Sequence, residues 1–276
     1  MKITLGFSPC PNDTFIFDAL VNKKIDTKGF DFEVRMEDVQ TLNQLAMQNT
    51  LDITKVSYGV LDLLLDDYIV LNSGSALGSG VGPLVIGKTQ AKPEEVENCT
   101  IALPGEHTTA HLLFKLAFPS AKNKIFLPYN QIEDFVLNSL HDNFLGVIIH
   151  ENRFTYEAKG LKKIIDLGSF WETETRSPIP LGGIVAKRSL DREVLKTIDQ
   201  LIKQSIEYSF KNYPAITDYV KEHAQEMNED VMRMHIDLYV NQFSLDLEET
   251  GKSAIKRLLA VDSVYKVAPF KGDMFL

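Results

Sequence analysis

The stretch that decides the expected fold reads Ile3-Thr-Leu-Gly-Phe-Ser-Pro-Cys-Pro-Asn-Asp-Thr-Phe-Ile-Phe17. Its apolar residues Ile3, Leu5 and Phe7 alternate with other residues, which is typical of a half-buried β-strand. Two prolines then end the strand, and Asp13 stands where an N-cap would satisfy the free N–H groups of a following helix. A strand tip that turns into a helix N-terminus is the favoured ligand position in an open α/β fold.

Composition narrows the class of protein. The 276 residues carry a net charge of -9, which argues against a nucleic-acid groove and favours solubility. No apolar run approaches the roughly 20 residues needed to cross a bilayer, so no membrane partner is expected. The opening residues 1–6 lack the apolar core of a secretory leader, and two distant cysteines imply no disulfide framework. We therefore expect a reduced, cytoplasmic protein.

Strand-like and amphipathic segments alternate along most of the chain, which favours a mainly parallel sheet in an α/β fold. Asp38 can cap an early helix, and a further helix is expected around Leu61–Leu65. Further strands are expected at 52–57, 68–71, 83–87, 100–103, 124–127, 145–150 and 163–167. Further helices are expected at 108–118, 132–140, 191–210, 222–243 and 248–259.

Two Gly- or Pro-rich stretches, 73–82 and 177–183, are expected to be crossings between lobes, because such residues cluster where the backbone bends. Residues 1–85 and 184–276 would then form one discontinuous lobe, and residues 86–183 the other. This plan is the layout of the periplasmic-binding-protein type II-like fold, in which a ligand lies in a cleft between two lobes.

The segment Gly146-Val-Ile-Ile-His150 indicates a buried strand that delivers an imidazole at its C-terminal tip. Catalytic groups of α/β folds commonly lie there, and a neutral imidazole can abstract a proton near pH 7. The alternative is a structural histidine that is hydrogen-bonded at a strand end.

Two further strand ends carry candidate binding residues. After the turn at Pro104 and Gly105, Thr108 can cap a helix whose first N–H groups, at Thr109 and Ala110, could hold a carboxylate. Simple capping without a ligand is the alternative. The segment Lys55-Val56-Ser57 closes another strand, with Lys55 and Ser57 on one side of it. Here the alternatives are a helix cap and a solvated charge.

Other motifs indicate little chemistry. His107 and His111 have metal-ligand spacing on a helix, but no intervening glutamate or third ligand accompanies them, so no metal is expected. Cys10 lies near a helix N-terminus, which can activate a thiol, although a small buried residue is the simpler interpretation. The glycines of 74–82 match no nucleotide-binding fingerprint.

Taken in order, the proline turn with Asn12-Asp13-Thr14, then Lys55-Val56-Ser57, Thr109-Ala110 and His150, resembles the motifs of the futalosine-pathway menaquinone enzymes, above all the 1,4-dihydroxy-6-naphthoate synthases. The resemblance implies that His150 is the proton acceptor. It also implies that Lys55, Val56, Ser57, Thr109 and Ala110 bind a small-molecule carboxylate substrate, and Asn12, Asp13 and Thr14 are expected to line the cleft.

The implied activity is that of a lyase. It would convert cyclic dehypoxanthinyl futalosine to 1,4-dihydroxy-6-naphthoate with release of dihydroxyacetone, without cofactor or metal. One alternative is the chorismate dehydratase of the same pathway, which a strand-tip histidine fits less well. The other, from a different class, is a solute-binding protein of a transporter.

Overall fold

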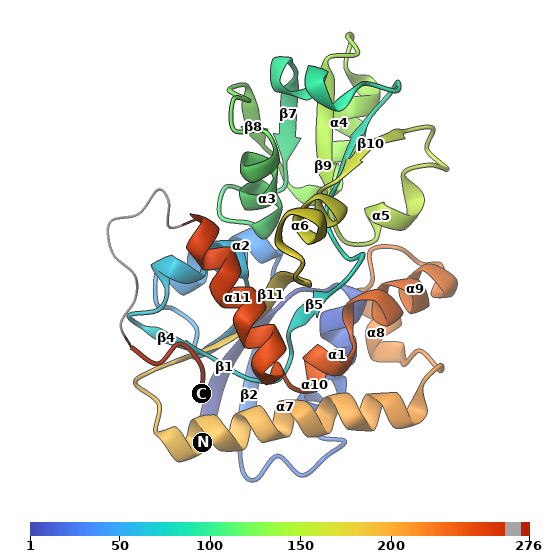
Figure 1. Cartoon of the computed structure of the whole chain (residues 1–276). Coiled ribbons are helices and arrows are strands. Elements are labelled where there is room, and N and C mark those ends of the chain that lie inside the picture. Colours follow the sequence, from blue (N-terminus) through green and yellow to red (C-terminus); the bar gives the residue numbers. More distant parts are fainter. Residues whose placement is uncertain (263–271) are drawn as a thin grey trace. The chain divides into compact units, whose positions relative to one another are not determined.

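Two mixed β-sheets, each with its own helices, organise the chain (Figure 1). The computed structural model describes residues 1–262 and 272–276. The first unit consists of Met1–Gly78 and Pro180–Leu276, and the second unit consists of Ser79–Ile179. Both divisions fall before the boundaries expected from the sequence, and an unbroken strand that includes residues 84 and 85 lies in the second unit.

The first unit contains a six-stranded sheet in which β5 pairs with β11 beside the main order β2-β1-β3-β11-β4. Its strands are β1 (Lys2–Phe7), β2 (Asp31–Met36), β3 (Ile53–Ser57), β4 (Tyr68–Val70), β5 (Ala76–Gly78) and β11 (Ile179–Lys187). β1 runs parallel to β2 and β3, whereas β11 runs antiparallel to β3 and β4. The carboxyl ends of β1 and β3 therefore lie at the same edge of this sheet.

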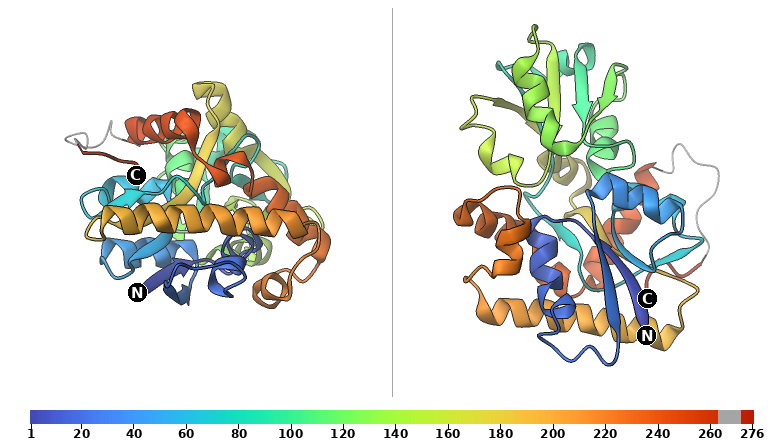
Figure 2. Two further views of the ribbon diagram at one scale, coloured as in Figure 1. Left: turned by 90° about the horizontal axis from the view of Figure 1, so that it is seen from below. Right: turned by 180° about the vertical axis from the view of Figure 1, so that it is seen from behind.

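Helices complete the first unit. They are α1 (Pro11–Val21), α2 (Val39–Met47), the 3-10 helix Tyr58–Leu63, α7 (Arg192–Asn212), α8 (Asp218–His223), α9 (Glu229–Tyr239), α10 (Gln242–Leu245) and α11 (Glu248–Asp262). Figure 1 shows α7 as the long helix at the bottom of the view, and the rear view in Figure 2 shows α8 and α9 beside α1.

The core of the first unit joins α1 to both β1 and α7. The rings of Phe7 on β1 and Phe17 on α1 stack at 4.5 Å. From α7, the Ser205 hydroxyl donates to the Ile16 carbonyl at 2.6 Å and accepts from the Leu20 N–H at 3.1 Å. Because apolar packing and buried hydrogen bonds act on the same helix, α1 is held firmly against the sheet and α7.

The second unit contains a five-stranded sheet of order β10-β6-β9-β7-β8. Its strands are β6 (Leu84–Gly87), β7 (Thr100–Leu103), β8 (Lys124–Phe126), β9 (Phe144–Ile148) and β10 (Lys162–Asp166). Its helices are α3 (Thr109–Ala117), α4 (Ile132–Asn138), α5 (Asn152–Thr155), α6 (Leu167–Thr175) and the 3-10 helices Pro93–Asn98 and Tyr129–Gln131. β7 runs parallel to β8 and β9, so the carboxyl ends of β7 and β9 share one edge.

The expectation of a mainly parallel sheet is wrong for both units. In the second sheet β6 runs antiparallel to β9 and β10, and in the first sheet β11 runs antiparallel to β3 and β4. Parallel neighbours need a crossover connection, usually a helix, whereas antiparallel neighbours do not. β6 follows the first passage of the chain between the units, and β11 includes the second passage.

Helix boundaries follow the capping residues closely. Asp38 caps α2 as expected, because its carboxylate accepts from the N–H groups of Gln40 and Thr41. The helix expected around Leu61–Leu65 is instead the 3-10 helix that ends at Leu63. The single helix expected at 222–243 is also wrong, because Asn228 and Asn241 each cap a new helix there.

Two glycines of the 73–82 stretch permit close packing. Gly74 has a φ of 89°, and a Cβ there would lie 2.0 Å from Cδ1 of Ile184. A Cβ on Gly82 would lie 2.2 Å from Cα of Gly168. Any side chain at either position would collide with its neighbour, so these glycines let the chain approach a packed partner.

Of the helices within the described ranges, none combines the length and apolar character that spanning a bilayer would require.

Candidate active site

The turn between β1 and α1 places its polar residues differently from the sequence prediction. Cys10, not Asp13, is the N-cap of α1, because Pro11 occupies the first helical position. Asp13 lies in the first turn, where its Oδ2 accepts from the backbone N–H of Ser8 at 3.1 Å and from its hydroxyl at 2.7 Å. The Thr14 hydroxyl turns back to donate to the Cys10 carbonyl at 3.1 Å.

Asp13 and Lys55 form a buried ion pair in the first unit. Lys55 Nζ donates to Asp13 Oδ1 at 2.8 Å and to the Gly74 carbonyl at 2.9 Å. The two side chains are only 6% and 3% exposed for Lys55 and Asp13 respectively. Lys55 is therefore not the solvated charge of the alternative interpretation, because its ammonium is buried and paired with a carboxylate.

Asn12 has one fixed orientation in this cluster. Its Nδ2 donates to Asp13 Oδ1 at 2.9 Å. A flipped amide would point an oxygen at that carboxylate, so the assignment follows from the network itself. The Asn12 Oδ1 is buried and accepts no hydrogen bond from the residues that the structure describes.

Ser57 ends β3 and does not act as a side-chain cap for the following 3-10 helix. Its hydroxyl accepts from Nδ2 of Asn43 at 3.1 Å, and its N–H donates to Oδ1 of the same side chain at 2.9 Å. Val56 is fully buried, and its backbone faces Gly183 of β11. The Lys55-Val56-Ser57 segment is thus held on both sides, and its polar groups are fixed by α1 and α2.

In the second unit, the turn after β7 leads into α3 as the sequence predicts. Gly105 has a φ of 148°, a region that favours glycine. The Thr108 hydroxyl caps α3, accepting from the His111 N–H at 3.2 Å and donating to the Gly105 carbonyl at 2.9 Å. Thr109 and Ala110 occupy the first two helical positions and are each 3% exposed. N–H groups at such positions have no acceptor within their own helix.

His150 lies just beyond β9, which ends at Ile148. Its φ of 56° is left-handed, a region that histidine enters more readily than most residues but still at a cost of about 1–3 kcal/mol. The ring of Tyr129 meets the imidazole edge-on at 5.0 Å between centroids. The Tyr129 hydroxyl also donates to Oε1 of the buried Glu151 at 3.3 Å. Strained backbone of this kind is often found at active sites.

The candidates thus fall into two groups, one in each unit. Within the first unit, Asn12, Asp13 and Thr14 follow β1, and Lys55 with Ser57 closes the neighbouring parallel strand β3. Within the second unit, the Thr109 and Ala110 turn follows β7, and His150 follows the neighbouring parallel strand β9. Each group lies at the carboxyl end of parallel strands, where α/β folds bind ligands.

His111, His235 and Cys10 have structural environments. Nδ1 of His111 bonds the Glu106 carbonyl at 2.8 Å, and desolvation lowers the pKa of this imidazole. His235 is fully buried on α9, beside the ring of Tyr239. Cys10 is buried at the start of α1. The absence of a metal remains an expectation.

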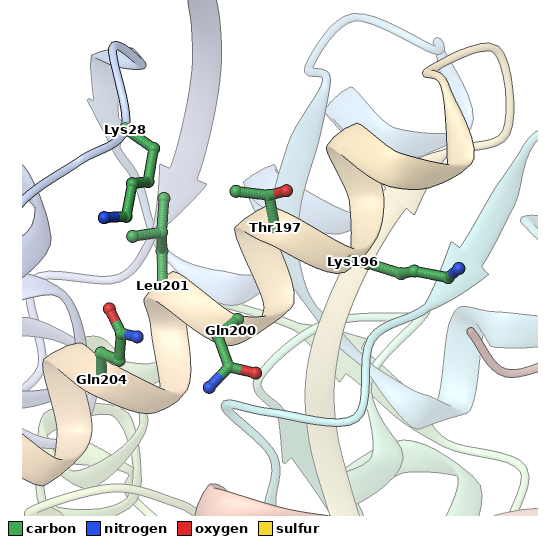
Figure 3. Close-up of a pocket in the computed structure, with 6 residues that line it drawn as sticks. All are labelled: Lys28, Lys196, Thr197, Gln200, Leu201 and Gln204. Atoms are coloured by element: carbon green, nitrogen blue, oxygen red, sulfur yellow. The ribbon is translucent and has the colours of Figure 1, made fainter.

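A separate hollow of about 250 Å³ lies along α7 (Figure 3). It is lined by Lys28, Lys196, Thr197, Gln200, Leu201 and Gln204. Lys28 pairs with Asp26 and Lys196 with Glu193, both at 2.7 Å. Figure 3 shows Lys196 directed away from Lys28, so the two ammonium groups do not converge on one ligand.

Sequence reasoning missed four residues around these groups: Ser8, Asn43, Tyr129 and Glu151. Ser8 lies within the quoted turn, and its position beside Pro9 was the available signal. Asn43 and Tyr129 lie on helices with no local feature that marks them. Their partners, Ser57 and Glu151, are distant in the sequence, so only the fold reveals them.

Comparison with known proteins identifies the family of this chain. Residues 3–262 match the family described as menaquinone biosynthesis. The chain belongs to that family.

Two named proteins are similar to this sequence over nearly the whole chain. One from Thermus thermophilus, named 1,4-dihydroxy-6-naphthoate synthase, is 41% identical over 94% of this chain and 93% of its own. One from Streptomyces coelicolor with the same name is 40% identical over 98% of this chain and 96% of its own.

Solved structures similar to this chain show its fold. Protein AF1704 from Archaeoglobus fulgidus is 30% identical, with a TM-score of 0.90 over 96% of this chain and 97% of its own. A ligand-binding component of an import system from Staphylococcus aureus is 14% identical, with a TM-score of 0.71 over 100% of this chain and 96% of its own. A Candida albicans protein described as having the generic periplasmic-binding-protein fold gives 0.68 at 11% identity, covering 98% of this chain and 92% of its own. The α/β periplasmic-binding-protein fold expected from the sequence is confirmed.

Proposed function

We propose that this protein is a carbon–carbon lyase that converts cyclic dehypoxanthinyl futalosine to 1,4-dihydroxy-6-naphthoate and releases dihydroxyacetone. The observation that carries the proposal is the identity of about 40% to two proteins named 1,4-dihydroxy-6-naphthoate synthase, over 94% and 98% of the chain. Membership of the menaquinone biosynthesis family supports the same pathway.

His150 is the proposed proton acceptor. Proton abstraction begins the reaction, elimination opens the sugar-derived ring, carbon–carbon cleavage expels dihydroxyacetone, and aromatisation draws the sequence forward. Imidazole suits the first step because it exchanges a proton near neutral pH. The left-handed backbone at His150 and its contact with Tyr129 support a fixed imidazole, which such a step needs.

Five residues are proposed to bind the substrate. Thr109 and Ala110 present the first N–H groups of α3, which suit a carboxylate. Lys55, Val56 and Ser57 contribute from the first unit, where the Asp13 carboxylate holds the Lys55 ammonium in place. We further propose that Asn12, Asp13 and Thr14 line the substrate site.

The alternatives receive less support. The curated relatives are named for the synthase and not for a chorismate dehydratase. The likeness to a ligand-binding component at 14% identity concerns the fold alone. A small-molecule substrate, a cytoplasmic location, and the absence of nucleic-acid and membrane partners remain parts of the proposal.

The test is incubation with cyclic dehypoxanthinyl futalosine and detection of the naphthoate by mass spectrometry. A binding protein would return the ligand unchanged, whereas the lyase must release altered products. The His150→Asn variant should bind the substrate but turn it over about 10²–10⁴-fold more slowly, because an amide is no base near pH 7. Asparagine also tolerates the left-handed backbone, so the fold should persist. A variant that keeps more than about half of the activity would show, on that scale, that another group is the base.

A further inference from the structure

The backbone around His150 is tied to the rest of the second unit by three consecutive side chains. We call residues 150–153 the His150 turn. Glu151 accepts a hydrogen bond from Tyr129 at 3.3 Å. Asn152 donates through Nδ2 to Oε2 of Glu133 on α4. Arg153 donates to Asp166 at 2.8 Å, and its N–H donates to the His150 carbonyl at 3.2 Å. The turn is therefore fixed at the three residues that follow its strained residue, His150.

The acceptor of the Asn152 hydrogen bond is a buried carboxylate, that of Glu133. The Glu133 side chain is 2% exposed. Besides Asn152, its Oε2 accepts from Lys159 at 2.7 Å, while its Oε1 has no partner among the residues that the structure describes. A buried carboxylate oxygen without a partner is destabilising, and an apolar side chain could fill the same space without that penalty. The hydrogen bond that Asn152 needs would explain why a glutamate occupies this buried position.

We infer that Glu133 is a positioning residue for proton abstraction: it holds Asn152, and through it the His150 turn, so that the imidazole keeps its place. The inference rests on the proposed function, in which His150 is the base. A left-handed residue persists only where its surroundings fix it. The bond from Asn152 to Glu133 is one of the contacts that fix this turn, two residues beyond His150. Glu133 touches neither substrate nor reacting atoms in this scheme.

Four variants test this role. Glu133→Ala and Asn152→Ala each remove one partner of the hydrogen bond between these two residues. Each variant should lower kcat about 10–100-fold and leave KM near that of the wild type, because misplacing a base impairs chemistry more than binding. The double variant should be no slower than the worse single variant, because both changes remove one interaction. Glu133→Gln keeps an acceptor for Asn152 and should restore most of kcat. Lys159→Ala is the matched control, since it removes the other partner of Glu133 and leaves Asn152 bonded.

The outcomes separate this inference from the proposed function. It is supported if kcat falls in both alanine variants, recovers in Glu133→Gln and stays near wild type in Lys159→Ala. It is overturned if Glu133→Ala turns over normally, if Glu133→Gln is as slow as Glu133→Ala, or if KM rises in step with kcat loss. Should Glu133→Ala fail to fold by circular dichroism, Asn152→Ala and Glu133→Gln decide by the same criteria. A wild-type enzyme that makes no naphthoate would refute the proposed function, and the inference would fall with it.

Discussion

We predict that the loss of Asp13 destabilises the protein more than the loss of its buried partner Lys55. Besides Lys55, the Asp13 carboxylate accepts from two donors of Ser8 and one of Asn12. The Lys55 ammonium has, besides Asp13, the carbonyl of Gly74. Removing the carboxylate therefore leaves a buried cation with one neutral acceptor, whereas removing the ammonium leaves an anion that still has three donors.

The magnitudes follow from these counts. Breaking a buried ion pair from one side costs about 3–5 kcal/mol, and we expect Asp13→Asn to lie in that range. Whichever way the new amide turns, its NH₂ group faces two of the four donors that the carboxylate served. Lys55→Met removes one charge-assisted hydrogen bond from Asp13 and should cost about 1.5–3 kcal/mol. In the double variant no ammonium is left unpaired, so its cost should fall below the sum by about 0.5–3 kcal/mol.

Urea unfolding followed by far-UV circular dichroism measures these free energies. The control is Lys23→Met, because Lys23 pairs with Asp31 on the exposed surface and its loss should leave the unfolding midpoint unchanged. The reasoning would be refuted if Lys55→Met destabilises the protein as much as Asp13→Asn does, or if the two effects simply add.

Two further predictions concern the second unit. Ala110→Pro removes an N–H at the start of α3 and should weaken substrate binding, measured by calorimetry, about 10–100-fold. This loss is the equivalent of one hydrogen bond to a charged group. Thr109→Ala keeps its N–H and should have a modest effect. Desolvation lowers the pKa of His111 in the folded protein, so the unfolded chain binds a proton at this residue more readily. The contribution of His111 to stability should be fully present above the unfolded pKa of about 6.5 and should fall as the pH drops below it. His111→Gln should flatten this fall in urea midpoints measured between pH 7.5 and pH 5.

Each of these predictions has a matched control. Ala110→Ser retains the N–H group and should bind substrate normally; equal losses in Ala110→Ser and Ala110→Pro would show that the backbone donor is not the cause. His141 is exposed, so His141→Gln should keep the acid-dependent fall in stability. The assignment to His111 fails if the fall is as steep in His111→Gln as in the wild type.

Local patterns predicted the elements that carry the candidate residues. Alternation in Ile3, Leu5 and Phe7 and the prolines after them gave the strand and turn, because both signals act within a few residues. Thr108 was recognisable as a cap for the same reason. The cap of α1 was misplaced at Asp13, although Pro11 at the first helical position could have identified Cys10.

Non-local features were beyond the sequence. The direction of β6 and β11 depends on strands far along the chain, so no local pattern revealed the mixed sheets. Lys55 lies 42 residues from Asp13, and no sequence pattern near either residue predicts their pairing. The tip of β9 was predicted at His150, yet the strand ends at Ile148 and His150 is left-handed, which the alternating or apolar pattern of a strand does not indicate.

The place of β11 between β3 and β4 has a consequence for synthesis on the ribosome. The second unit is continuous in the sequence, so all of its strands have been translated once residue 179 is added. The first sheet cannot close until β11 has been translated through Lys187, because β4 joins the sheet through that strand. Domains fold as units when their residues become available. The nascent chain should therefore complete its inserted unit first, while β4 and β5 still lack the strand through which they join the first sheet.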